Sequence, residues 1–165
     1  MKGKYTMIAL IAVYAKNRVI GKNGRIPWKI KGEQLRFREL TMGNAVILGR
    51  RSYEEIGKPL QGRYTIIVST KKEFKGENYC TAHSLLEAII IAQGKGLDSF
   101  ISGGAALYQE AIGLVEKMYL TELDAVIEGD TYFPVFSEKD FIREVECHIS
   151  ENGQIPYDYV TYTRV

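Results

Sequence analysis

The sequence lacks several features that would assign it to a specialised class of protein. Its two cysteines, Cys80 and Cys147, have neither CxxC spacing nor nearby histidines, so we expect two unlinked reduced thiols and no metal site. The two histidines, His83 and His148, are far apart in the sequence, and the GxSxG motif of a catalytic serine is absent. Nothing therefore favours covalent catalysis. No apolar run approaches the ~20 residues that span a bilayer, and no secretory signal is recognisable. We therefore expect a cytoplasmic protein without a membrane partner.

The charges are unevenly distributed, although the net charge is only +2. Residues 1–75 hold 17 Lys or Arg and 5 Asp or Glu, whereas residues 76–165 hold 5 and 15. The first half is therefore expected to face an anion. Its basic residues are scattered and are not interleaved with aromatic residues, which counts against nucleic acid. Charge alone still leaves open both nucleic acid and a small phosphorylated ligand.

Apolar runs alternate with helical segments along the chain, which predicts one α/β domain over residues 1–165 with a mostly parallel sheet. Strands are predicted at Thr6–Tyr14, Ala45–Leu48, Tyr64–Ser69, Ser99–Ser102 and Met118–Leu123, with a closing antiparallel pair at Phe141–Ser150 and Tyr157–Arg164. Helices are predicted at Lys31–Thr41, from Gly49 to about Ile56, from the N-cap Ser84 to Gln93, and at Ala105–Ile112. Between the first strand and the first helix, Ala15–Ile30 is predicted to be a long loop, and such loops are usually functional lids.

One carboxylate in the first predicted helix is unusual. Glu33 shares a stripe with Phe37 and Leu40, whereas Gln34 and Arg36 are expected to turn toward the other side. A carboxylate on an apolar helix face is costly unless it is paired, so a ligand is one possible partner. A first-turn glutamate that is stabilised by the helix dipole explains the same residue, and the pattern leaves both interpretations open.

Two predicted strands end at glycine where a helix begins, in VILGRRSYEEIG and FISGGAALYQEA, at Val46–Gly57 and Phe100–Ala111. Free backbone N–H groups and the helix dipole make such a junction a place for an anion. Arg50 and Arg51 add positive charge, and Ser52 adds a hydroxyl. Either junction alone is equally explained by a strand that simply turns into a helix. The presence of both junctions, together with the arginines, favours the binding of a dinucleotide, although neither segment matches GxGxxG or the P-loop.

Motifs along nearly the whole chain resemble those of dihydrofolate reductase. They begin with Asn17–Gly21, Ile26-Pro27-Trp28, Glu33 and Phe37. They continue in order through Gly49-Arg50, Ile56–Leu60, Gly62-Arg63, Gly103-Gly104 with Tyr108, Tyr119–Thr121 and Glu128–Pro134. The resemblance implies an eight-stranded mixed sheet flanked by helices, NADPH as hydride donor and 7,8-dihydrofolate as substrate. It also implies that diaminopyrimidine antifolates bind, and we expect a monomer with no nucleic-acid partner.

On the substrate side, the resemblance assigns roles to three residues that would act in catalysis. Glu33 would grip the pterin through two parallel hydrogen bonds, Thr121 would orient Glu33, and Trp28 would help to hold an ordered water near it. Arg63, with Lys58 nearby, would bind the α-carboxylate of the substrate's glutamate. The other implied substrate contacts are Ile11, Ile26, Gln34, Phe37, Ile56, Leu60, Ser102 and Tyr108.

On the cofactor side, the resemblance places the adenosine 2′-phosphate and the pyrophosphate at Arg51 and Ser52 with Ser69 and Thr70. The diphosphate would also meet Gly103 and Gly104. The remaining implied cofactor contacts are Ala12, Val13, Ile20, Gly21, Gly24, Gly49, Arg50, Val68, Ser102, Ala105, Ala106, Leu107, Tyr108 and Thr131. The segment Ala15–Ile30 would close over the nicotinamide and exclude water.

Several residues depart from the family's usual pattern. Many bacterial members carry Asp at the position of Glu33 and an apolar residue at that of Gln34. Ala106 stands where a phosphate-binding arginine or lysine is usual, so we consider Arg50, Arg51 and Lys71 as substitutes. The segment KGEQLRF, with Ser102 before the two glycines, resembles the type I trimethoprim-resistant members. We therefore expect reduced sensitivity to trimethoprim.

Two alternatives remain open at this point. A pyrimidine reductase of riboflavin synthesis shares the implied fold and cofactor, but it gives no reason for the Pro27-Trp28 lid followed by Glu33. A non-catalytic nucleotide- or nucleic-acid-binding domain would use the basic first half, and its binding to polyanions would depend strongly on salt. Loss of NADPH absorbance upon addition of dihydrofolate separates these two alternatives from a dihydrofolate reductase.

Overall fold

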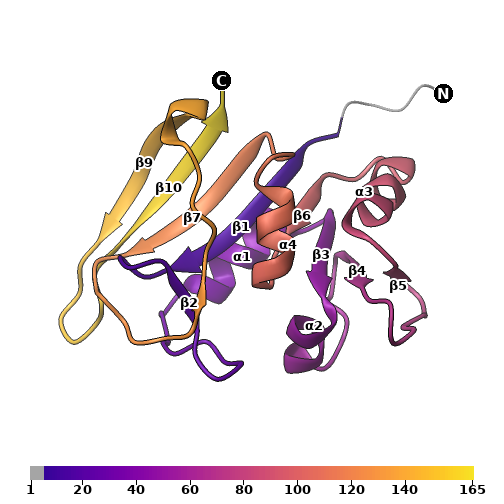
Figure 1. The fold of residues 1–165 in the computed structure, drawn as a ribbon, viewed down its shortest axis with the longest axis horizontal. Helices are drawn as coiled ribbons and strands as arrows, with labels where there is room; N and C mark the ends of the chain where they lie inside the picture. Colours follow the sequence, from indigo (N-terminus) through magenta and orange to yellow (C-terminus); the bar gives the residue numbers. More distant parts are fainter. Residues whose placement is uncertain (1–5) are drawn as a thin grey trace.

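A computed structural model describes residues 6–165, which form a central sheet with helices on both faces (Figure 1). In chain order the elements are β1 (Ile8–Tyr14), β2 (Val19–Gly21), α1 (Glu33–Thr41), β3 (Ala45–Gly49), α2 (Arg50–Ile56), β4 (Tyr64–Val68), β5 (Tyr79–Ala82), α3 (Leu85–Gly94), β6 (Ser99–Ile101), α4 (Ala105–Ala111), β7 (Lys117–Leu123), β8 (Thr131–Tyr132), the 3-10 turn η1 (Glu138–Asp140), β9 (Phe141–Ile149) and β10 (Tyr157–Arg164). The predicted helices and strands are present, and their ends lie within two residues of the expected positions.

The central sheet has eight strands in the order β5-β4-β3-β6-β1-β7-β10-β9. The strands from β5 to β7 pair in parallel, and β10 pairs antiparallel with both β7 and β9. This arrangement confirms the mixed, mostly parallel sheet. Because the carboxyl ends of parallel strands meet at one edge, the residues that follow β1, β3, β4 and β6 gather there. Figure 1 shows α2 and β2 at this end of the sheet.

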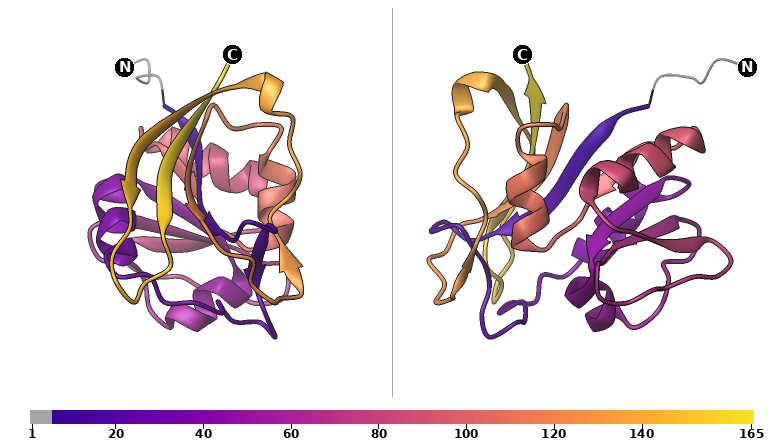
Figure 2. Two further views of the ribbon diagram at one scale, coloured as in Figure 1. Left: turned by 90° about the vertical axis from the view of Figure 1, so that its left-hand side faces the viewer. Right: turned by 45° about the vertical axis from the view of Figure 1, so that its right-hand side comes forward.

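The two faces of the sheet carry different helices. Phe37 and Leu40 of α1 pack on a cluster of Ala9, Ile11 and Phe100. A larger cluster on the other face joins the alternate strand residues, such as Leu10 and Ile101, to residues of α3 and α4. Side chains alternate between the faces of a strand, so neighbouring residues of β1 belong to different clusters. Figure 2 shows α1 and α4 on opposite sides of the sheet.

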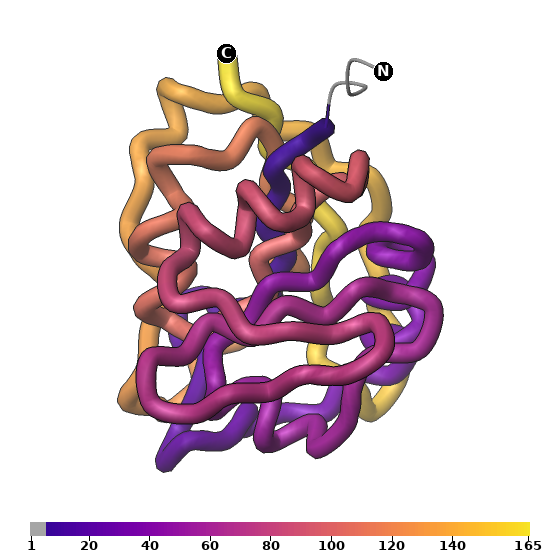
Figure 3. Tube along the Cα trace, turned by 90° about the vertical axis from the view of Figure 1, so that its right-hand side faces the viewer, coloured from indigo at the N-terminus to yellow at the C-terminus, as the bar shows by residue number. Residues whose placement is uncertain are grey.

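Three short strands were not expected from the sequence. The predicted loop Ala15–Ile30 contains β2, which pairs with β8 through Val19 and Tyr132 and through Gly21 and Thr131. This pair depends on contacts between distant segments, so no local hydrophobic pattern announces it. The strand β5 lies at the edge of the sheet, beside β4, where its mixed sequence YCTA is half exposed. Figure 3 faces this edge and shows the segment between β4 and β5 running along it.

The predicted cap of the third helix is confirmed. The Ser84 hydroxyl accepts a hydrogen bond from the Glu87 N–H at 3.0 Å and so caps α3. Cys80 and Cys147 are both free, and His83 and His148 are both exposed. Within residues 6–165, no helix is long and apolar enough to cross a membrane.

Candidate active site

The first turn of α1 places the Glu33 carboxylate against the sheet. The hydroxyl of Thr121, a buried residue of β7, lies 3.2 Å from each of the two carboxylate oxygens. Burial raises the pKa of the Glu33 carboxyl above its ordinary value of 4.5, while the Thr121 hydrogen bond and the charge of Arg36 oppose this rise. Because one hydroxyl cannot satisfy two carboxylate oxygens, Glu33 can still accept hydrogen bonds from a ligand.

The side chains beside Glu33 form an apolar wall that ends in a cation. Phe37 packs against Ile11 and also against the cluster on which Leu60 packs. The Arg63 guanidinium lies 5.8 Å from the Phe37 ring centroid and donates to Thr41 Oγ1 at 3.3 Å. Burial, together with the charge of Arg38, lowers the pKa of Arg63, so an anion at this place would be stabilised.

The structure brings together some of the predicted substrate residues and leaves others at the surface. Glu33, Thr121, Phe37, Ile11, Leu60 and Arg63 line the α1 face of the sheet. Ile26 and Ile56 are 63% and 42% exposed, and Lys58 and Gln34 are also exposed. Trp28 is half-buried. For all of these residues, those on the α1 face included, a binding role stays a prediction.

The two glycine-ended junctions form one site, because β3 and β6 are parallel neighbours. The Gly49 N–H donates to the Gly103 carbonyl at 2.8 Å. A Cβ added to Gly104 would lie 3.6 Å from Ser52 Oγ, so the start of α2 lies against the start of α4. Gly103 has a φ of +110°, which L side chains rarely adopt. Two sets of free N–H groups therefore face the same place.

Basic residues surround this place on the β4 side. Arg50 pairs with Glu54 at 2.9 Å, and Lys72 pairs with the same carboxylate at 3.4 Å. In the segment after β4, Ser69 Oγ accepts hydrogen bonds from the N–H groups of Lys71 and Lys72 at 3.2 and 3.1 Å. These contacts hold the segment beside α2.

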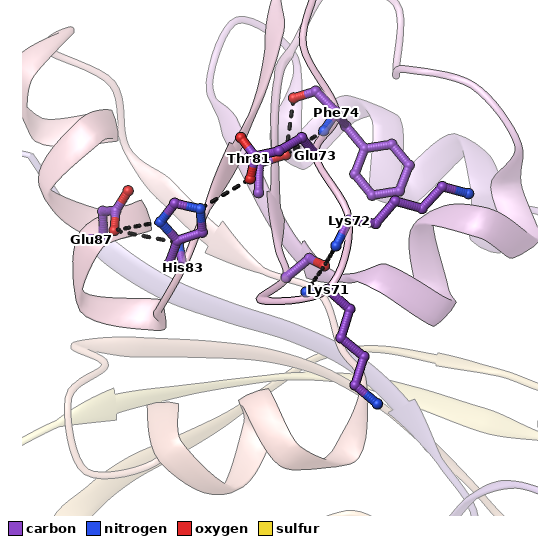
Figure 4. A network of polar contacts seen from close by, with 8 residues as sticks. Lys71, Lys72, Glu73, Phe74, Thr81, His83 and Glu87 are labelled. Carbon is purple, nitrogen blue, oxygen red and sulfur yellow. Dashed lines mark hydrogen bonds and ion pairs between the residues drawn. The ribbon is translucent and has the colours of Figure 1, made fainter.

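The same segment is tied to the end of β5, as Figure 4 shows. Thr81 Oγ1 donates to the Phe74 carbonyl at 2.9 Å, and His83 Nε2 lies 3.0 Å from Glu73. The hydrogen bond and charge of Glu73, with the charge of Glu87, raise the pKa of His83. The segment that carries Ser69 and Thr70 is therefore anchored at both of its ends.

The strand β1 separates from β6 beside this site. It pairs with β6 only from Ile8 to Leu10, whereas it continues to pair with β7 as far as Tyr14. The buried Tyr108 hydroxyl of α4 donates to the Ile11 carbonyl at 2.9 Å, just where β1 and β6 part. The backbone of Ala12 and Val13 therefore lies between the Glu33 face and the glycine junctions.

The predicted lid is attached to the segment before β8. Lys22 pairs with Glu128 at 2.6 Å, and the Asn23 N–H donates to Asp130 Oδ2 at 2.9 Å. The Asp130 N–H in turn donates to the Gly21 carbonyl at 3.0 Å. This part of the lid is therefore held against the β8 side of the molecule.

Comparison with known proteins decides the family. The sequence profile described as "Dihydrofolate reductase" matches residues 7–164. The chain belongs to the dihydrofolate reductase family. It is 39% identical to dihydrofolate reductase type 3 of Salmonella typhimurium over 128 residues, which is 78% of each chain. It is 34% identical to dihydrofolate reductase type A13 of Escherichia coli over 164 residues, which is 99% of this chain and 98% of the relative.

A solved structure of the dihydrofolate reductase family supports the fold as well. The Enterococcus faecalis enzyme, complexed with NADP(H) and RAB-propyl, superposes with a TM-score of 0.85. The two chains are 30% identical, and the match covers 96% of each. The eight-stranded mixed sheet expected from the resemblance to dihydrofolate reductase is thus confirmed.

One sequence prediction at this dihydrofolate reductase site is wrong. Arg36 does not turn away from the sheet, because its guanidinium lies 3.8 Å from the centroid of the Tyr159 ring and 3.3 Å from the Glu146 carboxylate. Residues three apart on a helix are surface neighbours, so Arg36 shares the side of Glu33. That spacing could have indicated Arg36. Tyr159 and Glu146 could not be found in this way, because they meet α1 only through the sheet.

Proposed function

We propose that this chain reduces 7,8-dihydrofolate to 5,6,7,8-tetrahydrofolate with NADPH. The observation that carries the proposal is the half-buried Glu33 carboxylate, which is hydrogen-bonded to Thr121 and lies beside an apolar wall. A planar pterin edge with an N–H and an amino group can donate two parallel hydrogen bonds to such a carboxylate. Phe37, Ile11 and Leu60 would enclose the rings, and Arg63 would hold the distal carboxylate of the substrate.

The site of the glycine junctions fits a dinucleotide. Gly103 and Gly104 leave room for a diphosphate to approach the backbone, and Ser52 adds a hydroxyl beside them. Arg51, Thr70 and Lys71 are exposed near the carboxyl ends of β3 and β4, and we assign the 2′-phosphate to this side. Arg51 and Lys71 would replace the basic contact that is missing at Ala106. When bound, NADPH supplies the hydride from its C4 to C6 of the pterin.

The protein would position the nicotinamide and the pterin and would shield them from bulk water. The opening between β1 and β6 would place the nicotinamide beside Ala12 and Val13, with Tyr108 behind them. The lid would cover this opening and would admit the water that protonates N5, with Trp28 and Glu33 nearby. Holding two reacting rings in place accounts for a large part of the rate enhancement in such a transfer.

We also propose that trimethoprim binds weakly. Glu33 is longer than aspartate by one methylene, so its carboxylate is displaced by about one C–C bond, and Gln34 and Ser102 make the wall more polar. Replacement of Glu33 by Asp should then lower the inhibition constant of trimethoprim by about tenfold. A wild-type inhibition constant equal to that of a sensitive bacterial enzyme would refute weak binding.

The reaction itself is tested by dihydrofolate-dependent loss of NADPH absorbance with the purified chain. We further propose that residues 1–165 act as one domain and as a monomer, which light scattering at assay concentration would check. A chain that binds NADPH but never consumes it with dihydrofolate would contradict the proposed reaction.

A further inference from the structure

Two side chains of α1, one turn apart, contact two side chains that are directly paired in the sheet. Glu33 accepts a hydrogen bond from Thr121 of β7, and the Arg36 guanidinium lies 3.8 Å from the centre of the Tyr159 ring of β10. Thr121 and Tyr159 are partners in the β7–β10 register. Directly opposed residues in an antiparallel pair share a face, so both contacts lie on the α1 side of the sheet.

An irregularity in β9 supplies the partner of Arg36. Tyr159 pairs with Cys147 and Val160 pairs with Val145, so Glu146 is an extra residue in a β-bulge. Bulges re-aim side chains. The Glu146 carboxylate accepts hydrogen bonds from Thr161 Oγ1 at 2.7 Å and from Arg36 at 3.3 Å. These two hydrogen bonds and the charge of Arg36 lower the pKa of Glu146, against the effect of burial, so Glu146 is a carboxylate at neutral pH.

The Arg36 guanidinium is therefore held from two sides. The Tyr159 ring covers one of its faces, Glu146 meets its edge, and the side chain is 18% exposed. A planar guanidinium suits both contacts, since it stacks on an aromatic ring and donates from its edge. Pairs at i and i+3 on a helix have Cβ atoms about 5–6 Å apart, so this fixed positive charge lies beside Glu33.

The other titratable groups that face Glu33 are uncharged. Tyr159 on β10 and Tyr108 on α4 are both close enough for the charge of Glu33 to act on them. Burial raises the pKa of each tyrosine further above its ordinary value, so both stay protonated. Thr121 on β7 is neutral, and Tyr157, whose ring packs on that of Tyr159, donates its hydroxyl to the Lys31 carbonyl at 3.2 Å. Arg36 thus provides the positive charge on this side of Glu33.

We propose that Arg36, clamped by Glu146 and Tyr159, is a positioning residue that keeps the Glu33 carboxylate ionised and aimed at the pterin. This inference rests on the reaction proposed above. It goes further by assigning part of the site to the β9 bulge, which does not touch the substrate. A purely structural role for Arg36 would affect unfolding but would leave the titration of Glu33 unchanged.

The test follows Glu33 directly in the chain without ligands. The carboxyl carbons of glutamate are labelled with 13C, the Glu33 resonance is assigned by its loss in Glu33→Gln, and its titration midpoint is measured by NMR. Arg36→Gln should raise the midpoint by about one pH unit, and Arg36→Lys should restore most of it. Lys139→Gln, which removes a charge from the exposed turn η1, serves as the matched control.

Kinetics then connect the midpoint to the reaction. Below the wild-type midpoint, Arg36→Gln should lower kcat/KM for dihydrofolate about tenfold more than it does well above the midpoint, with the KM for NADPH unchanged. An Arg36→Gln midpoint equal to that of Lys139→Gln, in a folded and active chain, would overturn the role of Arg36. A raised Glu33 midpoint in Arg36→Gln, found together with a wild-type chain that shows no turnover, would instead overturn the proposed reaction, and with it the part of Arg36 in that reaction.

Discussion

The Thr121 hydroxyl lies 3.2 Å from both carboxylate oxygens of Glu33, although the two residues are 88 positions apart in the chain. Glu33 belongs to α1 and Thr121 to β7, so the packing of this helix on the sheet holds the two groups together. The contact explains how a carboxylate can stay beside an apolar wall, because a hydrogen bond offsets part of the cost of burial. It also leaves Glu33 able to accept hydrogen bonds from a substrate.

Removing the Thr121 hydroxyl should lower activity toward dihydrofolate without abolishing it. In Thr121→Val the pKa of Glu33 should rise further, because the hydrogen bond from Thr121 now opposes the effect of burial. We expect kcat/KM for dihydrofolate to fall about tenfold, which corresponds to one lost hydrogen bond to a charged group. Thr121→Ser keeps the hydroxyl and should stay near the wild type. Equal activity of the Thr121→Val and Thr121→Ser variants would show that the Thr121 hydroxyl has no role in the reaction.

Glu33 should also reduce the stability of the fold. Its pKa is raised in the folded chain, so below its ordinary value of 4.5 it is protonated in both states and has no effect. As the pH rises past that value, the unfolded chain ionises first and the folded chain loses stability, until the pH exceeds the folded pKa. Glu33→Gln should therefore unfold at a higher temperature than the wild type at neutral pH, with no such advantage near pH 4. Thermal unfolding followed by circular dichroism at several pH values measures this difference, and a constant difference at all pH values would contradict it.

The sequence predicted the larger parts of this architecture because they depend on local patterns. Apolar runs indicated the buried strands, and the serine before α3 indicated its cap. The pairing of β2 with β8 and the contact of Arg36 with Glu146 join segments more than 100 residues apart, and no local pattern specifies such contacts. The approach of Arg36 to Tyr159 has the same origin. The residue pattern left two explanations for Glu33, a ligand partner or a first-turn residue stabilised by the helix dipole. Only the resemblance to dihydrofolate reductase favoured the ligand.

The glycine junction should tolerate no side chain at its centre. Gly103 has a φ of +110°, and an added Cβ would lie 3.4 Å from the Tyr108 hydroxyl. Gly103→Ala should therefore destabilise the fold by about 1–3 kcal/mol and weaken NADPH binding at least tenfold. Gly94→Ala is the matched control, because an added Cβ there meets nothing within 4 Å. Fluorescence titration with NADPH measures both variants, and equal affinity in the two would place the dinucleotide elsewhere.

The attachment of the lid should depend on Gly129. A Cβ at this position would approach the Gly21 carbonyl oxygen to 2.6 Å, so β2 and the segment before β8 would have to move apart. Gly129→Ala should lower kcat more than it raises the KM for dihydrofolate, because the lid would close less often. Gly113→Ala adds the same methyl group where nothing lies within 4 Å. If both variants turned over at the wild-type rate, the attachment would have no part in closure.

The most direct measurement is the loss of NADPH absorbance when dihydrofolate is added, made in parallel on the wild type and on Glu33→Gln. The wild type should consume NADPH only in the presence of dihydrofolate. The variant should bind NADPH with unchanged affinity but should lose about 100-fold in kcat/KM, as expected when a charged, doubly hydrogen-bonded partner is removed. Full turnover by Glu33→Gln, or no turnover by the wild type, would contradict the central claim that this carboxylate anchors the pterin for reduction.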